Sequence, residues 1–407
     1  MFIIISALLL CINALPAYAE EEVTLAQALE YFYTNNYDIL INKYEIDKAS
    51  ADLLGSKLLP NPTFSTNYTG LETSSVSYGD NTQRIFRIDQ LIELGGKRHF
   101  RIRAAEQTLE AARLSHEDTI RNILVGFYTF FYNLSLDMLN LKLAQEELKQ
   151  FEKSLDVAEK RYTAGFLSYV DFTKLKVAKV ASENNVLNAE RQLKIDSEQF
   201  RILIGIDKPV WPAQGQLQEI FPEYQEEEMI AKAYQSRQDL LSLQRQMKSA
   251  EYMISLAKAR RIPDVTVGTE YENFGYPGKT GIGFGISLNI PIFNWNQSEV
   301  SRRHAEYRQV ELQAAKTKRQ VESDIHLAYS GFTTALKVYE TYKNRKRDAE
   351  DLMEKSTKAF SLGGITVLDL LDTQKTYREF IGKYNQSAVQ CNLNHELLKV
   401  YTGDFKK

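Results

Sequence analysis

Two long stretches of the chain repeat their apolar residues every three or four positions, the spacing of one face of a helix. The first runs from Lys97 to Tyr162, contains no proline and has Gly126 as its only glycine. The second runs from Ser298 to Phe360, again without proline. At 1.5 Å per residue each stretch would extend for roughly 90 Å, so we predict two very long helices of the coiled-coil type.

A glycine turn and a second helix follow each long stretch. Gly165 can adopt the left-handed conformation that ends a helix. Ser168 can then cap a helix over residues 168–204, and Asp171, three residues later, suits both a capping box and the helix dipole. The pattern predicts an αα-hairpin whose tip lies at the glycine.

The hairpin pattern belongs to an internal duplication. Residues 162–172 recur as residues 360–370, an offset of 198 that also carries Gly205 onto Gly403. A second hairpin is therefore predicted, with its helix over residues 366–401. We divide the chain into a signal peptide at 1–19, a first repeat at 20–205, a connector at 206–225, a second repeat at 226–403 and a C-terminal tail at 404–407.

Residues 281–290 alternate strictly between apolar side chains and glycine or small polar ones. This alternation matches a transmembrane β-strand with its apolar face toward lipid. Residues 64–69 and 265–272 alternate more weakly, and residues 84–91 are predicted as a strand mainly from their place in the repeat. The fold class is therefore mainly α, with long coiled-coil hairpins and a small β part of four transmembrane strands per chain.

Four strands cannot close a barrel by themselves. An open sheet edge in lipid would leave backbone groups unpaired, so several chains must contribute to one barrel. Three chains would give twelve strands and a lumen, a count within the range of known barrels.

The first fifteen residues are almost wholly apolar, and Ala17 and Ala19 place small residues where a signal peptidase reads them. We therefore predict that the chain is exported. Cys11 follows Leu10 rather than a small residue, so we do not expect it to be lipidated. The mature chain keeps one cysteine, Cys391, and can form no internal disulfide, so we expect this thiol to be a small buried residue in a helix.

Composition excludes several classes of function. The chain has 50 Lys and Arg against 53 Asp and Glu, so nucleic-acid binding driven by overall charge is not expected. The only continuous apolar run is the N-terminal one, and it is shorter than the roughly 20 residues of a spanning helix, which excludes a helical membrane protein. The five histidines are scattered and only six methionines occur, so we predict no metal site, no cofactor and no catalytic constellation.

Several motifs together resemble the TolC-like outer-membrane efflux proteins, most closely their heavy-metal cation (CzcC/CusC) branch. They are the export signal, the duplication, the tip pattern Tyr-x-x-Gly-x-x-Ser-x-x-Asp, Leu-Pro-Asn-Pro at 59–62 and Leu-Gly-Gly-Lys-Arg at 94–98. The resemblance covers essentially the whole mature chain. It implies a homotrimer in the lipid of the cell outer membrane, with a twelve-stranded barrel continuous with an α-helical tunnel across the periplasm.

The resemblance also implies partners and a role. The tunnel would dock onto a periplasmic adaptor (membrane fusion) protein and an inner-membrane proton-driven pump of the RND type. The chain would then be a passive exit duct for cargo, with heavy-metal cations as the implied substrate, and not an enzyme.

The resemblance implies roles for residues at both hairpin tips. Acidic residues of the second tip ring the periplasmic aperture in the family, and Asp369 and Asp372 occupy the matching positions. Asp369 also suits helix capping, so Asp372 is the better candidate for the ring. The contacts with the adaptor would be made by Gly165, Phe166, Leu167, Ser168, Gly363, Gly364, Ile365 and Thr366.

Two other classes of function stay open. A periplasmic coiled-coil scaffold or adaptor would carry similar helices, but its strands would not need lipid-facing alternation. An outer-membrane hydrolase would need a catalytic group in the lumen, and the sequence offers none. Recovery from the soluble periplasm instead of the outer membrane would contradict the channel interpretation.

Overall fold

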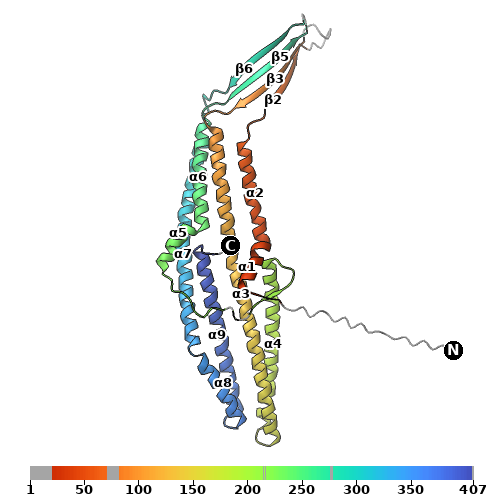
Figure 1. Cartoon of the computed structure of the whole chain (residues 1–407), viewed down its shortest axis with the longest axis vertical. Coiled ribbons are helices and arrows are strands. Elements are labelled where there is room, and N and C mark those ends of the chain that lie inside the picture. The colour runs from red at the N-terminus through yellow and green to blue at the C-terminus, as the bar shows by residue number, and fades with distance from the viewer. Residues whose placement is uncertain (1–20, 71–81, 214, 216, 276–277, 406–407) are drawn as a thin grey trace, which may run out of the picture. The chain divides into compact units, whose positions relative to one another are not determined.

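A computed structural model describes residues 21–70, 82–213, 215, 217–275 and 278–405 (Figure 1). The predicted signal peptide at 1–19, with Cys11, lies outside the described residues. The elements in chain order are β1 (Glu21–Val23), α1 (Leu25–Asn35), α2 (Tyr37–Lys57), β2 (Thr63–Thr69), β3 (Gln83–Ile92), α3 (Lys97–Thr163), α4 (Tyr169–Ile204), β4 (Val210–Pro212), α5 (Glu226–Ser236), α6 (Gln238–Ala259), β5 (Val265–Phe274), β6 (Thr280–Leu288), α7 (Gln297–Lys343), α8 (Lys346–Ser361) and α9 (Val367–Tyr401).

The described elements run twice through one succession: two helices, two antiparallel strands, a long helical stretch, a glycine turn and a last helix. The chain nevertheless divides into two compact units that each combine parts of both halves. The unit that we call the hairpin unit contains residues 125–222 and 331–396 and the segment ending at Asn36. The other, the sheet unit, contains residues 37–124, 223–330 and those from Leu397 onward. The repeat boundaries at 20–205 and 226–403 stay a prediction.

Long helices dominate the fold, as the apolar periodicity predicts. The helix α3 is uninterrupted over 67 residues, and Figure 1 shows α4 running back beside it, with α8 and α9 forming the second hairpin. None of the helices in the described part of the chain is both long enough and apolar enough to cross a membrane.

The second long stretch is not one helix, contrary to the prediction for Ser298–Phe360. It breaks between α7 and α8, where Arg345 has φ −109° and ψ 0° and its N–H donates to the Tyr342 carbonyl in a tighter turn. Side chains hold the break from both sides. The Lys343 ammonium lies 2.9 Å from a Glu219 carboxylate oxygen in the connector, and Arg345 pairs with Asp348. The connector contact is long-range, so helical periodicity alone could not predict this break.

Each half of the chain begins with two helices that are separated by a single extended residue. Asn36 lies between α1 and α2, and Arg237 lies between α5 and α6, both with ψ near 120°. The Asn36 amide donates to the Leu203 carbonyl at 2.7 Å, and the Arg237 guanidinium donates to the Tyr401 carbonyl at 3.2 Å. Both buried side chains therefore cap the last carbonyls of a distant helix, α4 or α9.

The hairpin unit contains one short sheet that the sequence pattern did not predict. In this sheet β1 pairs in parallel with β4, with Val23 opposite Pro212. Beside it, Gly205 has a φ of +69°, and a Cβ on it would lie 2.3 Å from the Asn35 carbonyl oxygen. Only glycine fits there, because the backbone of α1 approaches so closely.

Four strands form the sheet of the sheet unit, in the order β2-β3-β5-β6, and all neighbours are antiparallel (Figure 1). This confirms the predicted strands, including the poorly alternating segment at 84–91. The strand β6 ends at Leu288 and not at Ile290, because the next pairing positions on the neighbouring strand are Asp264 and Pro263, and proline has no N–H for the ladder.

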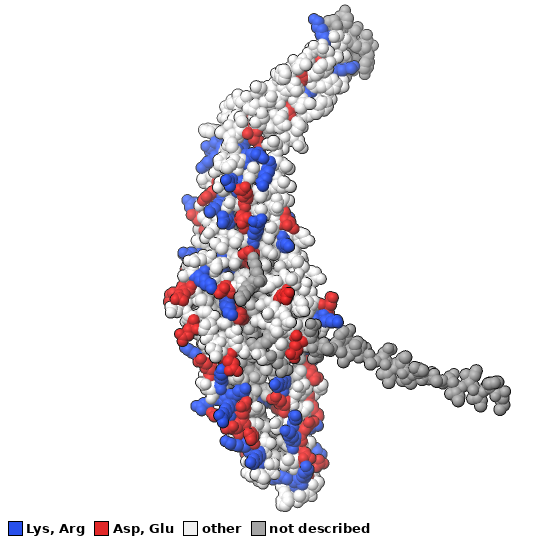
Figure 2. Space-filling model, in the orientation of Figure 1, with Lys and Arg blue, Asp and Glu red and all other residues white. Residues whose placement is uncertain are grey.

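The register gives the sheet two chemically different faces, because residues directly opposite each other share a face. One face is mostly polar and carries the glycines of β6. The other is apolar, and its large side chains are exposed in the single chain; they are Phe64, Tyr68, Phe86, Ile88, Ile92, Val267, Tyr271, Ile282, Phe284, Ile286 and Leu288. Figure 2 shows few charged residues over the strands and many over the helices.

Candidate functional site

The two hairpin tips are built by the same backbone motif. At the first tip the Phe166 N–H donates to the Arg161 carbonyl and the Gly165 N–H to the Tyr162 carbonyl. At the second tip, 198 residues later, the Gly364 and Gly363 N–H groups make the equivalent pair of bonds. Each set is a Schellman motif, with Gly165 at φ +80° and Gly363 at φ +82° in the left-handed region. The predicted glycine turns are confirmed.

Side chains cap the helix that follows each turn. The Ser168 hydroxyl accepts a bond from the Asp171 N–H at 3.0 Å, and the Thr366 hydroxyl accepts one from the Asp369 N–H at 3.1 Å. At the second tip the box is reciprocal, because an Asp369 carboxylate oxygen accepts from the Thr366 N–H at 3.0 Å. The hydrogen bonds from Thr366 lower the pKa of Asp369, and those from Ser168 and then Lys174 lower the pKa of Asp171.

A buried apolar cluster holds the two hairpins together just behind the tips. It combines residues of the first hairpin with residues of the second: Ala158, Phe172, Leu175, Phe360, Val367 and Leu370. Arg161 adds a polar link, since its guanidinium donates to the Phe360 carbonyl at 2.9 Å and lies 5.3 Å from the centre of the Phe360 ring. The tips are therefore one packed structure, and neither hairpin end is a free loop.

The predicted adaptor-contacting residues all lie at these tips. Phe166 is 78% exposed and Leu167 is half-buried against the cluster. At the second tip Ile365 is half-buried in the same way, while the glycines, Ser168 and Thr366 are exposed. The sequence did not single out Leu362, which is also 78% exposed. Each tip therefore presents one large apolar side chain at its surface.

An apolar groove lies beside the first tip. It has a volume of about 520 Å³ and is lined by the outer face of α4, with Leu371 of α9. Its larger apolar members, Tyr169, Val170 and Val177, are each exposed by more than 60%. This groove extends the apolar surface from the tip along α4.

The two predicted gate residues differ in their surroundings. Asp369 is committed to capping, because it accepts bonds from both the N–H and the hydroxyl of Thr366. Asp372 is exposed one turn further along α9, and no hydrogen bond or ion pair is formed by it within the described residues. Asp369 is exposed as well, but its carboxylate accepts hydrogen bonds from Thr366, whereas the carboxylate of Asp372 has no such commitment.

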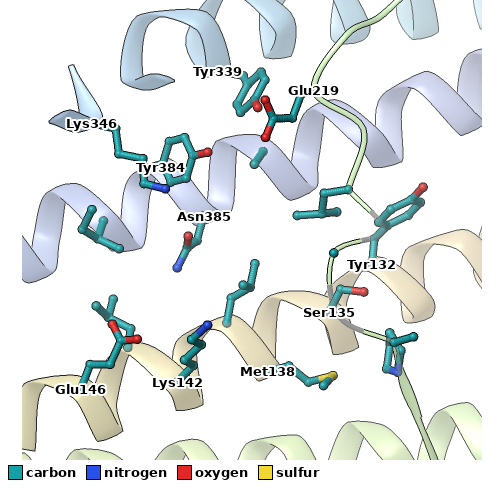
Figure 3. A pocket seen from close by; sticks show the side chains of 18 of the residues that line it. Tyr132, Ser135, Met138, Lys142, Glu146, Glu219, Tyr339, Lys346, Tyr384 and Asn385 are labelled. Atoms are coloured by element: carbon teal, nitrogen blue, oxygen red, sulfur yellow. The ribbon is translucent and has the colours of Figure 1, made fainter. Parts of the chain in front are cut away.

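A cavity of about 520 Å³ lies deeper in the hairpin unit, between α3, α9 and the connector (Figure 3). Lys142 and Glu146 of α3 face it from one side, and Lys346 and Tyr384 from the other. The Lys346 ammonium lies 4.8 Å from the centre of the Tyr384 ring, so the face of this ring is already in contact with a cation. The lining has both signs of charge and favours no single class of ligand. Within the described residues no group of three or more His, Cys, Asp or Glu could hold a metal ion.

Sequence reasoning missed two of the residues that shape the tips. Arg161 aligns with Ala359 in the duplication, so the repeat gave no reason to select it. Arg161 fixes the tip through its hydrogen bond to the Phe360 carbonyl, 199 residues away in the sequence. Leu362 aligns with Ala164. The one feature of the sequence that could have indicated its exposure is the presence of a leucine in a turn.

Comparison with known proteins gives matches over most of the chain. Residues 34–206 and 229–379 match the protein family described as outer membrane efflux protein. The cobalt-zinc-cadmium resistance protein CzcC of Cupriavidus metallidurans is 24% identical over 365 residues, which cover 89% of this chain and 85% of the relative. The nickel-cobalt-cadmium resistance protein NccC of Alcaligenes xylosoxydans xylosoxydans is 21% identical over 64% of this chain and 59% of its own length. The solved structure of CusC has a TM-score of 0.78 at 13% identity, covering 94% of this chain and 93% of the CusC chain, a likeness of fold.

Proposed function

Because the chain belongs to the outer membrane efflux protein family, we propose that it is the exit duct of a tripartite efflux system. Its location is the outer membrane. In the proposed system an inner-membrane proton-driven pump and a periplasmic adaptor deliver cargo, and this chain conducts it passively to the exterior. The energy and the choice of cargo then lie mainly in the partners.

The two-faced sheet is the observation that carries the proposal. Eleven large apolar side chains cover one face, and within the described residues no core packs against them, an arrangement that is stable only against lipid or another apolar surface. The opposite face is mostly polar, as a water-filled lumen requires. A periplasmic scaffold or adaptor, the second candidate, has no use for such a face, so this observation favours the channel.

The sheet also supports a homotrimer. Its two outer strands, β2 and β6, each have one edge without a neighbour in the described residues. In lipid these edges need partners, and three copies joined from β6 to β2 close a ring of twelve strands. The long helices of the three copies then form the periplasmic tunnel.

The tips support docking onto the adaptor. Their exposed Phe166 and Leu362 sit on a rigid base, because the buried cluster and Arg161 fix both turns. We propose that the adaptor contacts these residues together with the other predicted tip residues, and that Asp372 with Asp369 lines the periplasmic aperture. Rigid presentation lowers the entropy that docking loses.

Heavy-metal cations are the proposed cargo. CzcC and NccC are both named for resistance to cobalt and cadmium. As this chain holds no metal cluster within its described residues, the cations would cross it in hydrated form without tight binding.

Deletion of the gene in its own host, combined with fractionation, tests the proposal. We expect the protein in the outer-membrane fraction and increased sensitivity of the deletion strain to cobalt, zinc or cadmium, restored by the wild-type chain. A matched strain that expresses Phe166→Asp with Leu362→Asp should keep the protein in the outer membrane but stay metal-sensitive. Protein in the soluble periplasm would overturn the channel. Unchanged metal sensitivity with increased drug sensitivity would overturn only the cargo.

A further inference from the structure

A charged cluster crosses the polar face of the four-stranded sheet. The Arg87 guanidinium on β3 donates to Asp89 at 2.8 and 2.9 Å, and to Glu270 of the neighbouring strand β5 at 3.3 Å. Arg87 and Glu270 are directly opposite each other in the register, so their side chains lie on one face. These three side chains are only 21% to 32% exposed.

Glycines make room for these side chains to lie flat. A Cβ on Gly268 would lie 2.1 Å from an Asp89 carboxylate oxygen, and one on Gly283 would lie 2.8 Å from a Glu270 carboxylate oxygen. A Cβ on Gly285 would lie 3.2 Å from an Arg87 nitrogen. Gly283 and Gly285 of β6 therefore leave space for charged groups from two other strands to extend sideways along the sheet.

The charges on this face do not balance. Besides Arg87, Asp89 and Glu270, the face carries Glu272, which has no ion-pair partner within the described residues. One positive and three negative charges give a net charge of −2 per chain. The only other charged residue of the four strands is Arg84, which lies on the apolar face.

On the premise of the proposed trimeric channel, we infer that Asp89, Glu270 and Glu272 form a negative belt around the lumen that favours the passage of cations. The belt lies flat on the wall, so it sets the potential of the lumen without narrowing it. Twelve strands spaced about 4.8 Å apart and tilted by about 40° give a radius of roughly 12 Å to the backbone. That distance is close to the Debye length of about 10 Å at 0.1 M salt and far above about 3 Å at 1 M.

The belt deepens the proposed function because it assigns the class of cargo to this chain as well as to its pump. A fixed negative potential raises the concentration of cations in the lumen and lowers that of anions. Three copies would place six net negative charges on one ring of the wall. Cationic cargo is favoured over anionic cargo for this reason, whichever metal the pump delivers.

Planar-bilayer recordings under a potassium chloride gradient test the belt. The reference channel carries Asp369→Ala and Asp372→Ala, so that the acidic tip residues do not set the selectivity. We expect it to prefer potassium to chloride at about 0.1 M salt and to lose this preference near 1 M. Adding Asp89→Asn, Glu270→Gln and Glu272→Gln changes the net charge of the face from −2 to +1 per chain. The permeability ratio should then fall by about twofold or more and cross to anion preference.

Two further variants keep the test decisive. Glu272→Gln alone breaks no described ion pair and should shift the ratio in the same direction by a smaller amount, even if the triple variant fails to fold. Arg84→Gln changes one charge on the opposite face and should leave the ratio unchanged. If channels form but neither the Glu272 variant nor the triple variant alters the ratio, the belt is wrong. If the wild-type and reference chains form no channels at all, the proposed function itself fails.

Discussion

At the scale of single residues, a carboxyl group in the hairpin unit has an unusual titration. Asp137 of α3 lies against Asp196 of α4. Burial, and then the hydrogen bond and charge of Asp196, raise the pKa of Asp137 to about 7 from an ordinary 3.8. The folded chain therefore favours the protonated acid. Its contribution to stability is complete below pH 3.8 and is lost as the pH rises through 7.

Asp137→Asn should remove this pH dependence. We expect the variant to have a higher melting temperature than the wild type at pH 8, where the wild-type acid is ionised against Asp196. The gain should be much smaller at pH 5. Circular dichroism melts of the purified protein in detergent at the two pH values measure this difference in melting temperature. The control is Asp156→Asn, an exposed residue paired with Lys160, for which no such difference between the two pH values is expected. An equal gain for Asp137→Asn at both pH values would contradict the raised pKa.

The residues that form the tips divide by the range of their contacts. Ser168, Thr366 and the two turn glycines act on backbone groups within five residues, so the sequence was sufficient to predict them. Arg161 and Asn36 act on carbonyls more than 160 residues away. No local pattern marks such residues, because an arginine or asparagine on a helix is most often a solvated side chain.

At the scale of elements, Arg237 lies between α5 and α6 and links them to α7 and to the end of α9. It is 2% exposed and pairs with Asp239 at the start of α6 and with Asp324 of α7, while also capping α9. Burial acts against the charged form, but the bonds and charges of these two aspartates outweigh it and raise the pKa of Arg237. Arg237 is therefore the cation that both aspartates share at this junction.

Arg237→Met should destabilise the protein by about 3 kcal/mol, because it leaves two largely buried carboxylates without their partner. Chemical unfolding followed by tryptophan fluorescence or circular dichroism measures the loss. Arg308→Met is the matched control, since Arg308 is 73% exposed in its pair with Glu311 on α7. We expect that variant to change stability by less than about 0.5 kcal/mol. Equal effects for the two variants would show that Arg237 is not a junction.

At the scale of the whole molecule, the aperture of the proposed trimer would form where three copies bring their tips together. The single chain separates the two acidic candidates, since Asp369 caps its own helix and Asp372 does not. A ring of three carboxylates would bind cations and repel other anions, so its charge would control passage at the narrow end.

Replacing Asp369 and Asp372 together with alanine should raise the single-channel conductance in planar bilayers. We expect Asp372→Ala alone to produce most of the increase. Asp369→Ala alone should mainly lower the melting temperature, because it removes an N-terminal cap. Unchanged conductance in the double variant would indicate that both residues serve the hairpin only.

The sequence by itself determined the parts of this protein that depend on near neighbours. Helix periodicity, glycine turns, caps and strand alternation all arise from contacts within a few residues. Because the chain is duplicated, these patterns occur in both halves. Tertiary structure decided what depends on residues distant in the chain. The break between α7 and α8 lies beside Glu219, and β1 pairs with β4. The side chains of Arg87 and Glu270 lie flat over glycines of neighbouring strands. The partners in such contacts cannot be identified from a local pattern, because they come together only when the chain has folded.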